Sequence, residues 1–213
     1  MSARVFFVSG IDTDIGKTYA TGYLARLWND EGIVTLTQKP VQTGVESGLG
    51  DIATHCALMG TPLPSGEEAA LRLPQVFAYP ASPHFAAQKE GKEVDVEAID
   101  AATAQLALRC ERLLLEGAGG LMVPLTPTFL QVDFIAQRGY EVILVTSGRL
   151  GSINHTLLSL EALHVRGLKL HTLVFNEGFS EENKEITSAT QVYFQTYLST
   201  HFPQSTFITL PFL

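Results

Sequence analysis

Cysteine, positive charge and long apolar runs are all scarce in this sequence, and each scarcity excludes a class of protein. Only two cysteines, Cys56 and Cys110, occur among 213 residues, and they lie far apart without metal-binding spacing. A disulfide framework or a cysteine-based metal site is therefore not expected, and a reducing cytoplasm suits the chain. The 22 acidic residues outnumber the 14 basic ones, and the net charge of −8 argues against broad affinity for nucleic acid or for membranes.

The apolar segments are too short to cross a membrane, which would need a run of roughly 20 residues. The first residues, MSARVFFVSG, turn polar too soon for a signal peptide, so we expect a cytoplasmic protein. The hydrophobic fraction of 46% is nonetheless sufficient for a sizeable core. Residues 1–213 have the length of one ordinary domain and are predicted to form a single unit.

Continuous apolar runs alternate with segments of helical character along the chain. A run that is apolar throughout indicates a strand buried on both faces. The expected strands are Arg4–Ser9, Ile33–Gln38, Arg112–Glu116, Glu141–Thr146, His171–Asn176 and Thr206–Leu210, and the expected helices are 17–30, 95–110, 129–138, 152–166 and 181–200. The alternation predicts an α/β fold with a mostly parallel central sheet of about 6–7 strands and helices on both faces. The stretch Val41–Glu93, rich in Gly and Pro, is expected to be irregular and functional.

The stretch Val5–Thr18, VFFVSGIDTDIGKT, has the form of a strand, a glycine-bounded loop and a helix start. Such a P-loop unit cradles phosphate, because its glycines let several N–H groups point at one place and the helix N-terminus adds partial positive charge. Lys17 is placed to reach the β- and γ-phosphates, and the Thr18 hydroxyl is placed to ligate Mg²⁺. The loop is one residue longer between Gly10 and Gly16 than the general pattern.

Residues inside and beside this loop are further candidates for nucleotide binding. Thr13 and Asp14 lie within it, and Ile15 and Tyr19 lie close to its Gly-Lys-Thr end. For Asp14, a purely local role as a turn residue that accepts hydrogen bonds from nearby N–H groups stays open.

Ligands of a doubly wound sheet lie at the carboxyl ends of its strands, so the residues that follow each strand come next. Lys39 follows the second strand and would add a cation beside Lys17. Asp51 opens a helix-like stretch, Asp51–Met59, and either caps that helix or serves Mg²⁺.

The apolar run 113–115 ends in a carboxylate, Glu116, followed by the small residues 117–120. In nucleotide triphosphatases such an acid holds Mg²⁺, and small residues let the backbone approach the phosphates. This strand and the strand of the phosphate loop are expected to be neighbours in the sheet.

Two later strand ends carry polar residues with alternative roles. The segment Gly151–Asn154 begins a helix and either forms an anion site for a carboxylate or simply caps the helix. Asn176 ends the fifth strand and either reads the edge of an adenine or caps a turn.

Taken together, these residues resemble the dethiobiotin synthetase family. The resemblance covers the chain from Val5 to about Asn176, and the longer spacing of the phosphate loop is the one that this family uses. Thr43 stands where the family often has serine. The motifs that carry the resemblance are GIDTDIGKT, KPVQTG, Asp51, YPASPH, LLLEGAGGLMVPL, LGSINH and the strand that ends in Asn176.

The resemblance implies that 7,8-diaminononanoate is carboxylated with CO₂ or bicarbonate and MgATP, and that a carbamate and a carbamic–phosphoric anhydride precede closure of a cyclic urea. It implies catalytic roles for Lys39, Lys17, Thr13 and Thr43 and Mg²⁺ ligation by Thr18, Asp51 and Glu116. It implies substrate contacts from Lys39, Thr43, Ser82, Gly151, Ser152 and Asn154, the last three from the second subunit of a homodimer. The implied nucleotide-binding residues are Asp14, Ile15, Gly16, Lys17, Thr18, Tyr19, Asp51, Glu116, Gly117, Ala118, Gly119, Asn176 and Pro211. The short tail after Thr206–Leu210 is expected to weaken discrimination between bases.

The alternative is a switch-type ATPase resembling the partition and septum-site proteins, which act by binding protein partners. Those proteins usually carry a second lysine just inside the first glycine of the loop, where this sequence has Ile11. They also often end in a membrane-binding amphipathic helix, whereas the tail here is short and not basic. Both features favour the synthetase.

Overall fold

A fully parallel six-stranded sheet, in the order β10-β9-β8-β1-β5-β2, forms the centre of the computed structural model, which describes residues 3–180 and 183–211. All six expected strands are present, and β1 and β5 are neighbours as expected. The strands of this sheet are β1 (Arg4–Gly10), β2 (Thr35–Gln38), β5 (Arg112–Gly120), β8 (Glu141–Ser147), β9 (Leu170–Asn176) and β10 (Thr206–Leu210). The predicted α/β fold with a parallel sheet is therefore confirmed.

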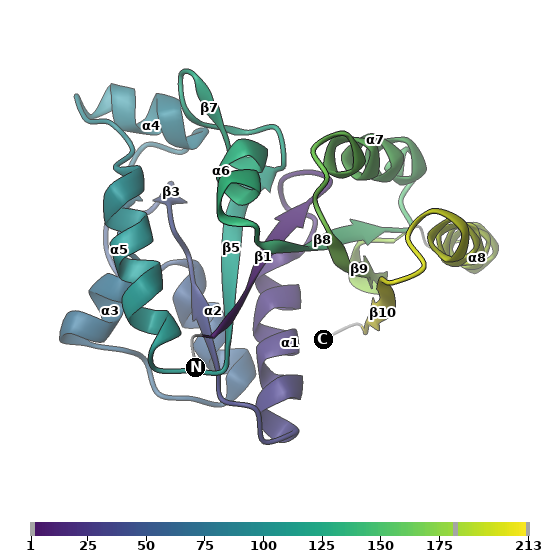
Figure 1. The fold of residues 1–213 in the computed structure, drawn as a ribbon, viewed down its shortest axis with the longest axis horizontal. Coiled ribbons are helices and arrows are strands. Elements are labelled where there is room, and N and C mark those ends of the chain that lie inside the picture. Colours follow the sequence, from purple (N-terminus) through teal and green to yellow (C-terminus); the bar gives the residue numbers. More distant parts are fainter. Residues whose placement is uncertain (1–2, 181–182, 212–213) are drawn as a thin grey trace.

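Helices cover both faces of the sheet and connect its strands. Figure 1 shows α7 and α8 beside β8–β10 at one end of the molecule, and α3, α4 and α5 at the other end. The helices are α1 (Lys17–Asp30), α2 (Asp51–Met59), α3 (Gly66–Arg72), α4 (Pro83–Lys89), α5 (Val96–Ala107), α6 (Gln131–Arg138), α7 (Ser152–Val165) and α8 (Lys184–His201), with a 3₁₀ turn, η1 (Glu177–Phe179). Within the described residues no helix is long and apolar enough to cross a bilayer.

The stretch Val41–Glu93 is more regular than expected, because its prolines lie between short elements rather than inside them. It contains α2, α3 and α4, and the short strands β3 (Gln42–Thr43) and β4 (Val76–Phe77) pair in parallel. Pro83 is the first residue of α4, where its missing N–H costs nothing. A second small pairing joins β6 (Pro124–Thr126) to β7 (Phe129–Leu130), so that α6 begins later than the predicted helix 129–138.

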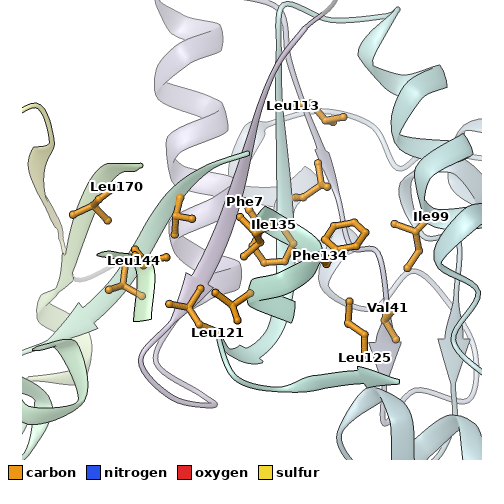
Figure 2. Packing of buried hydrophobic residues seen from close by; sticks show 14 of the residues in the cluster. Phe7, Val41, Ile99, Leu113, Leu121, Leu125, Phe134, Ile135, Leu144 and Leu170 are labelled. Atoms are coloured by element: carbon orange, nitrogen blue, oxygen red, sulfur yellow. The ribbon is translucent and has the colours of Figure 1, made fainter. Parts of the chain in front are cut away.

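The two faces of the sheet bury separate clusters, because successive side chains of a strand point in opposite directions. Phe6 of β1 packs on α1, with its ring centroid 5.1 Å from that of Trp28. Phe7 faces the other layer, where its ring lies 6.1 Å from Phe134 of α6. Figure 2 shows Phe134 and Ile135 beside Phe7 in this second cluster. Burial on both faces explains why the strands are apolar throughout.

A glycine inside α1 lets α2 pack closely against it. A Cβ atom on Gly22 would lie 2.8 Å from Leu58 Cδ1 and 3.2 Å from His55 Cα. Glycine inside a helix lowers its stability. Here it permits the close approach that sets α2, and the side chains at its start, next to the carboxyl end of β5.

The buried side-chain amide of Gln38 joins β2 to α3 and α5. Gln38 at the end of β2 donates from Nε2 to the Leu71 carbonyl of α3 at 2.9 Å. Its Oε1 lies 2.7 Å from the hydroxyl of Thr103 on α5, which is also 2.8 Å from the Ile99 carbonyl. Gln38 and Thr103 are both buried, so each hydrogen bond replaces one that water would otherwise make.

We predict that Thr103→Val lowers the free energy of unfolding by about 1–3 kcal/mol, because Gln38 Oε1 is then buried without a donor. The measurement is urea unfolding followed by circular dichroism. Thr190→Val on α8 is the matched control, because the Thr190 hydroxyl bonds the Ile186 carbonyl in the same i−4 manner and is also buried. Equal losses in the two variants would show that the bond to Gln38 contributes nothing.

Candidate active site

The loop between β1 and α1 is held in shape by a glycine and by an asparagine from a distant strand. Gly16 has a φ of 91° and precedes the first residue of α1. Asn176 donates from Nδ2 to the Ile15 carbonyl at 3.0 Å and accepts from the Gly178 N–H at 3.0 Å. Asn176 thus caps the turn after β9 and fastens the phosphate loop, and its amide group is engaged on both sides by the protein.

Lys17 is buried at the end of this loop. Its Nζ donates to the Asp12 carbonyl at 2.9 Å, which closes the loop on itself. Burial, together with the nearby charge of Lys39, lowers the pKa of the Lys17 ammonium group to about 8. A phosphate group would supply the negative charge that this cation lacks.

A buried ion pair joins Lys39, the residue after β2, to Glu116 in the middle of β5. Lys39 Nζ is 2.8 Å from Glu116 Oε1, 2.6 Å from Asp51 Oδ2 and 3.1 Å from the Gly117 carbonyl oxygen. The side chains of Lys39 and Glu116 are 6% and 1% exposed. Thr18 at the start of α1 also donates its hydroxyl to Glu116 Oε1, at 2.9 Å.

The charges in this cluster stabilise one another against burial. Burial alone would raise the pKa of Glu116, but the charge of Lys39 and the hydrogen bond from His55 hold that pKa far below its ordinary value. Burial alone would lower the pKa of Lys39, yet Glu116 and Asp51 raise it above its ordinary value. Lys39 and Glu116 are therefore both charged at neutral pH.

Asp51 belongs to the charged cluster and does not cap α2, and its binding of Mg²⁺ stays a prediction. The N-cap of α2 is Gly50, and no side chain caps that helix end. The Asp51 carboxylate turns instead to Lys39, and its backbone N–H donates to Gln42 Oε1 at 3.0 Å. The helix-capping interpretation of Asp51 was wrong, because α2 starts from a glycine turn.

Sequence reasoning missed His55, which lies on the same face of α2 as Asp51. Its Nε2 is 2.6 Å from Glu116 Oε2, and its side chain is fully buried. The available signal was the i, i+4 spacing of Asp51 and His55 on a helix, which places both side chains toward one target.

Lys17, Lys39, Asp51 and Glu116 line one cavity of about 820 Å³, large enough for a nucleotide with a small substrate, whereas His55 lies outside its lining. Val41, Gln42, Pro80, Ala81, Pro83, Val123 and Phe179 also line it and were not predicted. The predicted residues that line it are Thr13, Asp14, Gly16, Lys17, Thr18, Tyr19, Lys39, Thr43, Asp51, Ser82, Glu116, Ala118 and Gly119.

Several predicted residues lie outside the lining of this cavity. Ile15 is buried beneath the loop, and Gly117 contributes its carbonyl to Lys39. Pro211 is exposed after β10. Gly151, Ser152 and Asn154 lie at the start of α7, which the chain does not bring into its own cavity. Arg149, just before α7, instead forms an ion pair with Asp12 of the phosphate loop.

The parallel sheet, the glycine-bounded loop after β1 and the buried carboxylate in β5 define a P-loop nucleotide-binding fold. The AAA domain family matches residues 4–202. The ATP-dependent dethiobiotin synthetase BioD 2 of Pasteurella multocida (strain Pm70) is 42% identical over 205 residues, which cover 96% of this chain and 96% of that protein. The chain belongs to the dethiobiotin synthetase family, as the sequence motifs predicted.

Further comparisons agree with this family and with this fold. The ATP-dependent dethiobiotin synthetase BioD of Chlorobaculum tepidum is 45% identical over 192 residues, covering 90% of this chain and 80% of that protein. The signal recognition particle receptor FtsY of Elizabethkingia anophelis, solved in complex with GDP, superposes with a TM-score of 0.53 at 15% identity. That match covers 97% of this chain and 56% of the receptor, and it supports the fold alone.

We predict that Gly16→Ala destabilises the protein and weakens nucleotide binding, because the added Cβ would collide with Asn176 Nδ2. Gly48→Ala is the matched control, since Gly48 has the same φ of 91° but a Cβ there meets nothing within 4 Å. Both variants share the strain of a left-handed alanine, of order 1–3 kcal/mol. Thermal melting and titration with a fluorescent ATP analogue measure the difference, and indistinguishable variants would contradict the role of the Asn176 contact.

Proposed function

We propose that the chain is an ATP-dependent dethiobiotin synthetase that carboxylates 7,8-diaminononanoate with CO₂ or bicarbonate and closes a cyclic urea. The observation that carries this proposal is the buried Lys39–Glu116 pair beside the phosphate loop. It supports phosphoryl transfer to a substrate oxygen, which needs positioned charges rather than a protein nucleophile. The family relatives are named for this activity.

The residues around the cavity divide the work between them. Lys17 and the N–H groups of the phosphate loop bind the ATP phosphates. Lys39 neutralises charge on the substrate carbamate and on the γ-phosphate, while the hydroxyls of Thr13 and Thr43 donate to their oxygens. The carbamate oxygen attacks the γ-phosphorus and ADP leaves. The second amine then attacks the carbonyl carbon, phosphate leaves and the ring closes.

The donor set beside the phosphate loop fits Mg²⁺. Thr18, Asp51 and Glu116 offer one hydroxyl and two carboxylates on one side of the cavity. Within residues 3–180 and 183–211 no three His, Cys, Asp or Glu side chains form a metal cage of their own. One hydroxyl and two carboxylates are a donor set that suits Mg²⁺, since this ion usually binds one or two carboxylates and completes its coordination shell with phosphates and water. When bound, the ion would neutralise phosphate charge.

The remaining nucleotide and substrate contacts follow from the cavity. Asp14, Gly16, Tyr19, Ala118 and Gly119 line the cavity and would contact the nucleotide. Ser82, just before α4, also lines the cavity and would contact the diamine. Ile15, Gly117, Asn176 and Pro211 remain proposed nucleotide neighbours that act through the backbone or through the walls of the site.

A homodimer would place the start of α7 at the cavity of the partner subunit, where Gly151, Ser152 and Asn154 bind the carboxylate of the substrate. One feature supports it. A groove of about 510 Å³ beside α7 is lined by apolar side chains that include the exposed Met122 and Leu158. We propose a cytoplasmic enzyme that acts on small molecules rather than on nucleic acid or membranes.

We predict that Lys39→Ala leaves ATP binding largely intact but lowers kcat by roughly 10²–10³-fold, because one cation that stabilises the transferring group is lost. Steady-state kinetics and calorimetric ATP titration measure the two quantities. Lys92→Ala, which removes an exposed lysine away from the cavity, is the control. A Lys39→Ala variant that loses ATP affinity and turnover to the same extent would contradict this role.

The decisive experiment for the proposed function is phosphate release with MgATP and bicarbonate, with and without 7,8-diaminononanoate. We expect release that depends on the diamine, together with a product whose mass is that of the cyclic urea. Slow release that is indifferent to the diamine would contradict the synthetase and favour the switch-type ATPase.

A further inference from the structure

His55 makes one hydrogen bond, and that bond goes to the carboxylate at the centre of the site. Its side chain is fully buried, and its Nε2 lies 2.6 Å from Glu116 Oε2. An ionised carboxylate can only accept hydrogen bonds, so Nε2 carries the hydrogen. The other ring nitrogen, Nδ1, is buried without a hydrogen-bond partner among the described residues.

This bond separates the two oxygens of Glu116. Oε1 accepts from Thr18 Oγ1 at 2.9 Å and from Lys39 Nζ at 2.8 Å, on the side of the phosphate loop. Oε2 accepts from His55 on the side of α2. The carboxylate is therefore held from both sides, and its plane cannot rotate without breaking a short buried bond.

The helix that carries His55 is itself fixed in place. The close contact of α2 with Gly22 of α1 involves the His55 backbone, since a Cβ on Gly22 would lie 3.2 Å from His55 Cα. One turn earlier on α2, Asp51 pairs with Lys39 at 2.6 Å. Two side chains of α2 thus contact the buried ion pair: Asp51 contacts Lys39, and His55 contacts Glu116.

Packing alone does not account for the histidine. Burial of Nδ1 without a partner costs free energy that an apolar side chain of similar size would not lose. The bond to Glu116 is then the feature that distinguishes His55 from a leucine at the same place.

We propose that His55 is a positioning residue for Glu116: it fixes Oε2 so that Oε1 is presented toward Thr18 and the phosphates of the nucleotide. The inference rests on the proposed function, because it assigns Glu116 to the Mg²⁺ that accompanies ATP. His55 acts through Glu116 and does not line the cavity.

The test compares His55→Leu with His55→Gln, because the glutamine Nε2 reproduces the donor that faces Glu116 and leucine removes it. The first readout is the Mn²⁺ concentration that half-saturates the protein with a non-hydrolysable ATP analogue, followed by electron paramagnetic resonance without diamine. We expect His55→Leu to raise this concentration about tenfold, as is typical for loss of a residue that orients a metal ligand. His55→Gln should stay close to the unaltered protein, and Glu116→Gln should bind Mn²⁺ most weakly.

Two further readouts separate positioning from a structural role. The melting temperature of His55→Leu should fall, because Glu116 Oε2 is then buried without a donor, and His55→Gln should restore it. In His55→Leu, kcat at saturating Mg²⁺ should recover while the Mg²⁺ requirement stays raised. An unchanged half-saturating concentration in His55→Leu would overturn the proposal. So would a lowered melting temperature that accounts for the loss and that glutamine does not restore.

The experiments distinguish failure of the role of His55 from failure of the proposed function. If the protein forms no cyclic urea but His55→Leu still weakens Mn²⁺–nucleotide binding, the synthetase assignment fails and the positioning role stands. If the unaltered protein does not bind Mn²⁺ with the nucleotide, the positioning role fails as well.

Discussion

The buried ion pair between Lys39 and Glu116 is the constraint on which the rest of the site depends. Two charges that are almost withdrawn from water are tolerated only when they are paired and further hydrogen-bonded, since an isolated buried charge is very costly. Here the residue after β2 supplies the cation, β5 supplies the anion, and α2 supplies Asp51 and His55. The order of the strands and the glycine contact between α1 and α2 serve to bring these groups together.

The two lysines of the site have opposite electrostatic surroundings, and this suits two different tasks. The carboxylates of Glu116 and Asp51 both lie beside Lys39, so the pKa of Lys39 is raised and its ammonium group stays protonated. Burial and the charge of Lys39 lower the pKa of Lys17 to about 8, and within the described residues the hydrogen bond of its ammonium group goes to the carbonyl of Asp12 rather than to a carboxylate. A phosphate therefore gains more from Lys17, which has no negative partner of its own, than from Lys39.

Apolar runs and strand ends predicted much of this architecture from the sequence. Lys17 was identified from the phosphate-loop pattern, and Lys39 and Glu116 because ligands of a parallel sheet gather where its strands end. That reasoning needs no knowledge of side-chain contacts, although β5 continues past Glu116 to Gly120. His55 was missed because its partner lies on a different element, reached only through the α1–α2 contact at Gly22. The hydrogen bond from Asn176 to the Ile15 carbonyl of the phosphate loop likewise joins residues far apart in the sequence, so a local pattern cannot reveal it.

A P-loop fold alone does not determine what chemistry follows phosphate binding, which depends on residues outside the phosphate loop. The GDP complex of the receptor FtsY shares the fold at 15% identity, so the sheet and the phosphate loop are common to proteins with different tasks. The features that favour a synthetase lie beyond that loop. Lys39 follows β2, and Thr43, Pro80 and Ser82, which also line the cavity, come from the segment between β2 and α5. A synthetase needs such additional lining to hold a second reactant beside the nucleotide, whereas a switch protein needs only the nucleotide and a surface that responds to it.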